Sequence, residues 1–538
     1  MKRIVCILLA LLMVISAFSG CKWFSRKEDS KRQTKPEIDN PYLVFSLTDE
    51  MVDDFYALLE ESEALAIAAE DLELTDQVSD ELEDAYLALV DQYQIAYVLY
   101  CLDQKDEEAK TRYLDCVDLF TEADAAYNDM CKRVWLSETP FRDHLFEDWT
   151  EDEIERMLAY NDEIAQLEKR NSEITVEYRE LATGWGPEMI PLYNEMVQNN
   201  NRIAEIYGYE NYYVYAYDVV YERDYEMSEI EKMRRYAASY LIDAHAGAMD
   251  TFMELYENMD EDGSDFLSHY IYEDYDTLEE NYVREYLNAL PDSARENMES
   301  MFSEDRVVFT SYKNAYAGAF TTWIGEEPFC FFGPDYANSE TVIHELGHYY
   351  GSGFAEAWAQ PMDLAETQSQ GNEWLFTHFM QTQLDADVYE CLTAYKLLTD
   401  LGYIVCFIMV DEFEQQVYSH ENAGNLTEDE YDAIMEEIAQ QYGGIDYVTE
   451  NMLDVQTYWR QVVLESPVYY ISYAVSGITA INLFTMAQED EDAAIASYIR
   501  LQEEPLEDAG FLANIRYAGI NGPFDKSVYE KLCSRYEK

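Results

Sequence analysis

Residues 341–348 read TVIHELGH and contain the pattern His-Glu-x-x-His inside an apolar run with helical spacing. Two histidines four positions apart lie on one face of an α-helix, so His344 and His348 can direct their imidazoles at one metal ion. Glu345 lies about 100° further round the helix, within reach of a metal-bound water. Since its neighbours are apolar, the helix is predicted to be buried.

The third ligand has to come from elsewhere in the chain. Catalytic zinc takes three protein ligands and keeps a fourth position for water. The metzincins use a histidine ten residues after the first, a position that Phe354 occupies, which excludes that class. The alternative is a glutamate on a following helix, and Pro361 suits the first turn of such a helix. Glu366 and Glu373 lie seven positions apart on one face, so one can bind zinc while the other supports a histidine from behind.

These two helices resemble those of a known family. With the histidine helix, the segment 365–374, AETQSQGNEW, resembles the thimet oligopeptidase and oligoendopeptidase F family of zinc peptidases. The resemblance includes residues 206–212 and 316–332 and spans about the last 330 residues. It implies that Glu366 is the third ligand of one zinc ion and that Glu373 supports the site. Helix phase and flanking residues favour Glu366 over three alternatives, which are Glu356, Asp363 and Glu373.

The resemblance has further implications near the C-terminus. Tyr469 and Tyr473 correspond to family residues that contact the developing oxyanion, and a neutral phenol can donate such a hydrogen bond. Simple helix packing is the alternative role for both tyrosines. The family's histidine a few residues before Pro467 is missing, and no histidine follows His420. The family also implies a two-lobed helical body around a deep channel, with short unstructured peptides as substrates.

The remaining pattern predicts a mainly α protein. Residues 42–183 contain no glycine and one proline, which favours nearly continuous helix. Thr150 and Glu153 form a predicted capping box at the start of one helix. Breaks are expected at residues 71–75, 103–107, 138–148 and 184–187. Three runs rich in β-formers predict a small sheet next to the histidine helix, and they are residues 307–310, 319–323 and 328–332. The family resemblance implies that the last run offers an edge strand to an extended substrate.

The N-terminus predicts export and lipid anchoring. A basic start is followed by an apolar run over residues 4–18, which is typical of a signal peptide covering residues 1–20. The following Cys21 resembles the lipidated cysteine of bacterial lipoproteins, and an incidental cysteine after a cleaved signal is the alternative. Residues 21–45 are predicted to be a flexible tether, 46–205 an N-terminal helical region and 206–538 the catalytic domain. The expected location is the bacterial cell surface, anchored in the membrane through Cys21.

Charge and cysteine content narrow the classes further. The chain has 110 acidic and 35 basic residues, a net charge of -75, which excludes nucleic acid as a partner. Beyond the signal peptide and Cys21, seven widely spaced cysteines form no disulfide framework. The histidine motif and the family resemblance together predict peptide-bond hydrolysis with Glu345 as the general base. The rival reading is a surface protein that keeps the fold and binds peptides without turnover.

Overall fold

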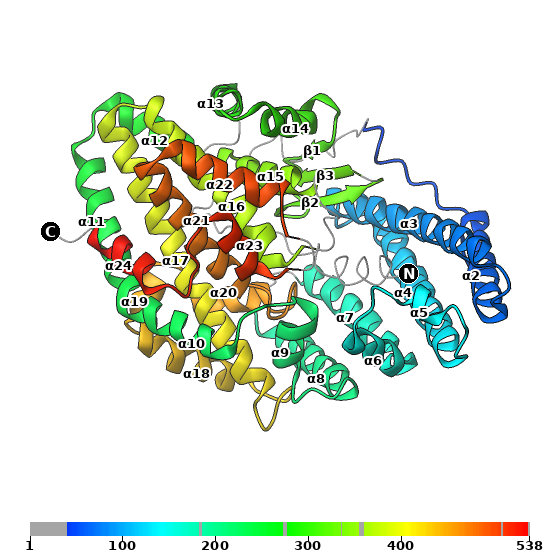
Figure 1. Cartoon of the computed structure of the whole chain (residues 1–538). Helices are drawn as coiled ribbons and strands as arrows, with labels where there is room; N and C mark the ends of the chain where they lie inside the picture. Colours follow the sequence, from blue (N-terminus) through cyan, green and yellow to red (C-terminus); the bar gives the residue numbers. More distant parts are fainter. Residues whose placement is uncertain are drawn as a thin grey trace. The chain divides into compact units, whose positions relative to one another are not determined.

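The computed structural model describes residues 40–181, 186–272, 277–325, 327–334, 336–353, 360–506 and 509–535. The predicted signal peptide, Cys21 and most of the predicted tether lie outside these residues. Helices dominate the described part of the chain, and its strands form a three-stranded sheet (Figure 1). This confirms the predicted mainly α class with a small sheet.

Contacts divide the chain into two compact units, each made from several segments. The described part of the first unit comes from residues 40–179, 198–212 and 305–334. Its main elements are α2 (Asp49–Ala68), α3 (Leu72–Leu102), α4 (Glu107–Leu136), α5 (Arg142–Leu145), α6 (Glu151–Ala159), α7 (Asp162–Glu180), β1 (Val307–Phe309), β2 (Ala319–Ile324) and β3 (Glu327–Phe332). The predicted division between residues 205 and 206 stays a prediction.

The helices of the first unit begin where the sequence supplies a capping side chain. Thr150 accepts a hydrogen bond from the backbone of Glu153, and the Glu153 carboxylate accepts one from the backbone of Thr150. This confirms the predicted capping box at the start of α6. Asp71 and Asp106 cap α3 and α4 in the same manner, with carboxylates that satisfy the first free backbone N–H groups.

The sheet has the strand order β1-β3-β2, and its strands match the three predicted runs. β3 pairs in parallel with β1 and antiparallel with β2. The expectation that residues 328–332 form an edge strand is wrong, because β3 is the central strand and is paired on both sides. Its residues 328–332 are all buried, as a central strand requires.

The described part of the second unit comes from residues 180–197, 213–304 and 335–535, with α8 contributing to both units. Its elements are η2 (Pro187–Met189), α8 (Ile190–Ile206), α9 (Tyr212–Tyr215), η3 (Ala216–Val220), α10 (Met227–Tyr236), η4 (Ala237–Leu241), α11 (Ile242–Asn258), α12 (Glu261–Tyr272), α13 (Thr277–Ala289), α14 (Asp292–Ser303), α15 (Ser339–Ser352), α16 (Met362–Phe379), η6 (Met380–Thr382), α17 (Ala386–Tyr418), α18 (Glu428–Ala439), η7 (Gln440–Tyr442), α19 (Ile445–Asn451), α20 (Val455–Val462), α21 (Ile471–Glu489), α22 (Glu491–Glu503), α23 (Phe511–Ala518) and α24 (Lys526–Ser534).

The helix α17 forms the core of the second unit and packs against α11, α18 and α21. Its 33 residues are long and apolar enough to cross a membrane, but 72% of the apolar window is buried inside the protein. Its apolar surface is therefore largely covered by neighbouring helices, as in the core helix of a folded body. The described cysteines are free, as predicted, and all but the half-buried Cys533 are buried.

A buried charge on α17 ties three other elements to this core. The Asp411 carboxylate accepts hydrogen bonds from the hydroxyls of Tyr213 and Tyr217 at 3.0 and 2.6 Å. It also accepts one from Nη2 of Arg234 on α10 at 2.7 Å. The side chain of Asp411 is fully buried, so these partners replace the water that its charge has lost.

We expect Asp411→Ala to lower the free energy of unfolding by about 3–5 kcal/mol, because Arg234 would stay buried without its ionic partner. Denaturant titration followed by circular dichroism measures this loss. The matched comparison is Thr150→Ala, which removes one cap and should cost about 1 kcal/mol. A smaller loss for Asp411→Ala than for Thr150→Ala would contradict the structural role of this cluster.

Candidate metal centre

The helix α15 carries both predicted histidines. Asn338 caps its first turn by accepting a hydrogen bond from the backbone N–H of Thr341 at 3.2 Å. His344 and Glu345 are buried, and His348 is half-buried. Because the histidines are four positions apart, their rings share one face, with the two Nε2 atoms 3.1 Å apart. The helix therefore presents two nitrogen donors to one point.

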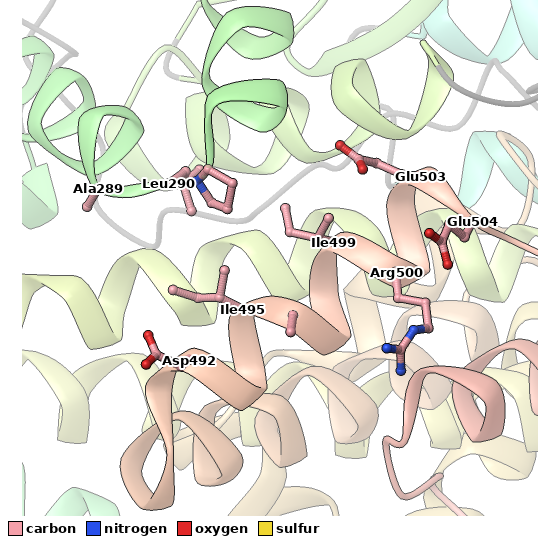
Figure 2. Close-up of a pocket in the computed structure, with 10 residues that line it drawn as sticks. Ala289, Leu290, Asp492, Ile495, Ile499, Arg500, Glu503 and Glu504 are labelled. Atoms are coloured by element: carbon pink, nitrogen blue, oxygen red, sulfur yellow. The ribbon is translucent and has the colours of Figure 1, made fainter.

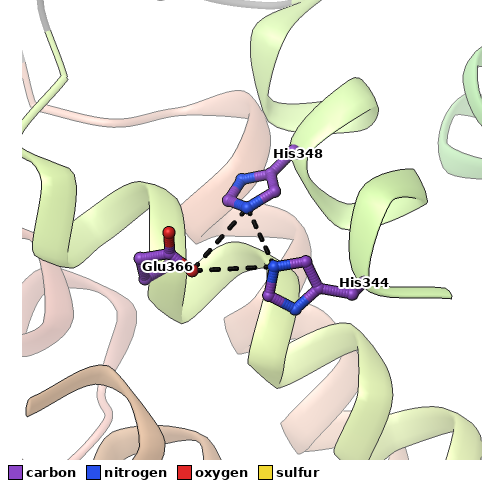
Figure 3. Close-up of side chains that lie close together, drawn as sticks. All are labelled: His344, His348 and Glu366. Carbon is purple, nitrogen blue, oxygen red and sulfur yellow. Dashed lines mark hydrogen bonds and ion pairs between the residues drawn. The ribbon is translucent and has the colours of Figure 1, made fainter. Parts of the chain in front are cut away.

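The third predicted donor comes from α16. The Glu366 Oε2 atom lies 3.7 Å from Nε2 of His344 and 3.7 Å from Nε2 of His348. Figure 3 shows the three side chains directed toward one another from the two helices. Donors about 2.1 Å from a tetrahedral zinc ion are about 3.4 Å apart, and the three observed spacings lie close to that value. The residues present therefore fit a small divalent cation.

Close packing of α15 against α16 makes this convergence feasible. A Cβ atom on Gly347 would lie 2.6 Å from Cα of Ser369 and 2.8 Å from the carbonyl oxygen of Gln368. Only glycine fits at that position without separating the two helices. Asn372 on α16 also donates a hydrogen bond to the carbonyl oxygen of Ile343 at 2.7 Å, which fixes the register between the helices.

A chain of charged groups supports His344 from behind. Its Nδ1 atom lies 2.7 Å from Oε1 of Glu373, on the ring side opposite the donor nitrogen. The other Glu373 oxygen accepts a hydrogen bond from the Lys396 ammonium at 2.6 Å, and Lys396 also lies 3.2 Å from Asp400. With a proton on Nδ1, this arrangement leaves Nε2 with a lone pair for a metal.

The buried groups have shifted acidities. Burial raises the pKa of Glu366 to about 7, although His344 and Tyr469 partly offset this effect. Burial opposes the charged form of His344, but the hydrogen bond and charge of Glu373 outweigh it and raise the pKa of His344 to about 9. Burial, then the charge of His344, lowers the pKa of His348. A cation that binds here has to displace protons at neutral pH.

Both predicted tyrosines lie at this centre. Tyr469 precedes α21, Tyr473 lies in its first turn, and their ring centroids are 5.1 Å apart. The Tyr469 hydroxyl donates a hydrogen bond to Oε1 of Glu366, the oxygen that does not face the histidines. Burial, then the charge of Glu366, raises the pKa of Tyr473 well above its usual value. Tyr469 is therefore a hydrogen-bond donor in this structure, and the raised pKa of Tyr473 favours its neutral, donating form.

The remaining ligand candidates do not join the group. Glu373 contacts the far side of His344, and Asp363 lies one turn before Glu366 outside the cluster of donors. Glu356 and Phe354 lie outside the described residues.

The sequence did not identify the roles of Lys396 and Asp400. A lysine between the apolar residues of α17 could have indicated a buried ion pair.

A pocket of about 590 Å³ lies elsewhere on the second unit. Figure 2 shows Ile495 and Ile499 of α22 on one wall and Leu290 on another, with Asp492 and Glu503 among the charged groups. The Glu503 carboxylate accepts a hydrogen bond from the Tyr350 hydroxyl of α15 at 2.7 Å. None of the predicted site residues lines this pocket.

Comparisons with known proteins give matches to solved structures. No family model and no curated protein matches the chain. PZ peptidase A, solved with an inhibitor, is 17% identical with a TM-score of 0.71, covering 94% of this chain and 98% of its own. A protein assigned as oligoendopeptidase F from Bacillus anthracis strain Ames is 17% identical with a TM-score of 0.69, covering 94% and 97%. Oligoendopeptidase-F from Enterococcus faecium is 13% identical with a TM-score of 0.54, covering 91% and 97%. The chain therefore has the oligoendopeptidase F fold, which confirms the predicted resemblance.

We expect Gly347→Ala to lower the affinity for zinc by roughly 10–100-fold, because the added methyl group separates α15 from α16 and moves Glu366 away from the histidines. Competition with a chromophoric chelator measures the affinity. Gly402→Ala in α17 is the matched control, since its Cβ would lie 3.5 Å from Met452 in ordinary contact. Equal affinities in the two variants would refute the close-packing argument.

Proposed function

We propose that the protein is a zinc-dependent oligopeptidase that hydrolyses peptide bonds of short extracytoplasmic peptides. The observation that carries the proposal is the cluster of His344, His348 and Glu366 donors at the spacing of a tetrahedral ion, with Glu345 beside them. The oligoendopeptidase F fold supports the reaction class. The predicted deep channel and the position of the sheet beside α15 stay predictions.

In the proposed reaction His344, His348 and Glu366 hold the zinc ion. Zinc at this position would polarise the scissile carbonyl and lower the pKa of a water molecule toward about 7. Glu345 accepts a proton from the attacking water and then transfers it to the nitrogen of the leaving amine. Glu345 is buried next to His344 on α15, and after burial and the nearer partners its charge also contributes to the raised pKa values of Glu366 and His344.

The two tyrosines have a proposed role in stabilising charge. As the carbonyl carbon becomes tetrahedral, its oxygen gains negative charge. The phenols of Tyr469 and Tyr473 stabilise this charge by donating hydrogen bonds to the oxygen. Tyr469 has to leave its hydrogen bond with Glu366 to do so, and the cation would take over part of that carboxylate's charge. This role would compensate in part for the absence of the family's histidine before Pro467.

A second function follows from that same absence. A protein that keeps the fold and the metal but has lost turnover would bind peptides at the surface of the cell. The chain has no histidine after His420, so no imidazole from the C-terminal segment can replace the missing one. The retention of Glu345 favours the enzyme, because a peptide-binding protein has no evident need for a general base.

We expect Glu345→Gln to keep zinc and to lower peptide cleavage by roughly 10²–10⁴-fold, because glutamine cannot accept the water proton. A quenched-fluorescence peptide library measures cleavage, and elemental analysis measures zinc. Glu437→Gln, an exposed change on α18, is the control and should keep full activity. Chelation should abolish cleavage in the wild type, and added zinc should restore it.

Undiminished activity in Glu345→Gln would refute the mechanism. Bound zinc without any cleavage by the wild type would favour the binding protein.

For the proposed location, we expect Cys21→Ala to move the protein from the membrane fraction to the soluble extracytoplasmic fraction, because the acyl chains lose their attachment site. Fractionation of a bacterial host and labelling with a clickable fatty acid measure this change. A Cys101→Ala variant is the control, since Cys101 is buried within α3. Label retained by Cys21→Ala would contradict lipidation at this residue.

A further inference from the structure

The segment that presents Tyr469 has an unfavourable backbone conformation. Val468 has a φ of 63°, in the left-handed region that a β-branched residue strongly disfavours. Tyr469 follows it directly, and the α21 helix begins at Ile471. Such a conformation persists when surrounding contacts hold it in place. The contacts around Val468 therefore decide where the Tyr469 hydroxyl lies.

The first contact comes from α17. Glu414, whose side chain is buried, accepts a hydrogen bond from the backbone N–H of Val468 at 2.8 Å. Burial raises the pKa of Glu414 well above its usual value, which favours the neutral acid. A neutral amide of the same shape could accept the same bond.

The second set of contacts comes from the turn before α10. Nη2 of Arg223 donates to the carbonyl oxygen of Val468 at 2.8 Å and to Oγ of Ser472 at 3.1 Å, and lies 3.4 Å from the carbonyl oxygen of Tyr469. The guanidinium stacks on the ring of Tyr221, 4.4 Å from its centroid. The buried Arg223 therefore binds the chain before Tyr469, at the Val468 carbonyl, and after it, at the Ser472 hydroxyl.

We propose that Arg223 and Glu414 are positioning residues that hold Val468 in the left-handed conformation and thereby keep the Tyr469 hydroxyl at the metal centre. The inference rests on the proposed function only for its effect on catalysis. The geometric part concerns this chain's own contacts, so it can be tested without peptide cleavage. Neither residue touches Glu366 or the histidines in the contacts described above.

The geometric test places 3-fluorotyrosine at position 469 of the full chain and records the fluorine resonance after chelation. Arg223→Lys loses the two-sided contact, and Glu414→Met loses the acceptor for the Val468 N–H, so both should displace or split the resonance. Glu414→Gln keeps an acceptor oxygen and should preserve the wild-type resonance. Arg460→Lys is the matched control, because Arg460 is 7% exposed against 8% for Arg223 and pairs with Glu428 and Asp432. An unchanged resonance in both Arg223→Lys and Glu414→Met overturns the proposal.

The catalytic test combines Glu414→Met with Tyr469→Phe. We expect Tyr469→Phe to lower kcat by roughly 10²-fold and Glu414→Met by roughly tenfold, with KM retained. The kcat of the double variant should match that of Tyr469→Phe alone, because Glu414 acts through a hydroxyl that is already absent. Arg223→Lys provides the same comparison if Glu414→Met fails to fold. If the loss of kcat in the double variant equals the product of the two single losses, the catalytic part of the inference is overturned. If Arg223→Lys and Glu414→Met displace the resonance but the wild type cleaves no peptide, the positioning role of the two residues is supported and the proposed peptidase function is refuted.

Discussion

The candidate metal centre depends on two helices that approach more closely than side chains normally allow. Gly347 permits α15 to contact α16, and that contact brings a carboxylate within 3.7 Å of two imidazole nitrogens in a buried environment. A charged carboxylate is poorly solvated there, which is why burial raises the pKa of Glu366. A divalent cation would satisfy all three donors at once, so the same packing that disfavours the carboxylate's charge creates a candidate site for a cation.

The buried helix α17 supports this centre at two places. Lys396 neutralises Glu373 behind His344, and Glu414 holds the segment that carries Tyr469. A third buried group, Asp411, secures α10 through Arg234. Each of these polar side chains is buried, and a buried charge without a partner would be strongly destabilising. The core of the second unit therefore also orients the groups around the metal centre.

The structural relatives show how little sequence identity this architecture needs. PZ peptidase A and the two oligoendopeptidase F structures share 13–17% of residues with the chain, yet cover more than nine-tenths of it. Two helices with the right phase and one close contact are compatible with many surfaces.

The spacing along the chain was sufficient to place the two histidines on one helix face and Glu366 and Glu373 on another, because residues four or seven positions apart share a helix face whatever surrounds them. The family resemblance then favoured Glu366 as the ligand. The helical content, the capping box and the three β runs followed from local preferences in the same way. Three other features depend on partners far apart in the sequence. They are the central position of β3, the pairing of Glu373 with Lys396, and the hydrogen bonds that Arg223 and Glu414 make with Val468. Their positions are set by packing between elements, and local spacing carries no information about which element lies next to which.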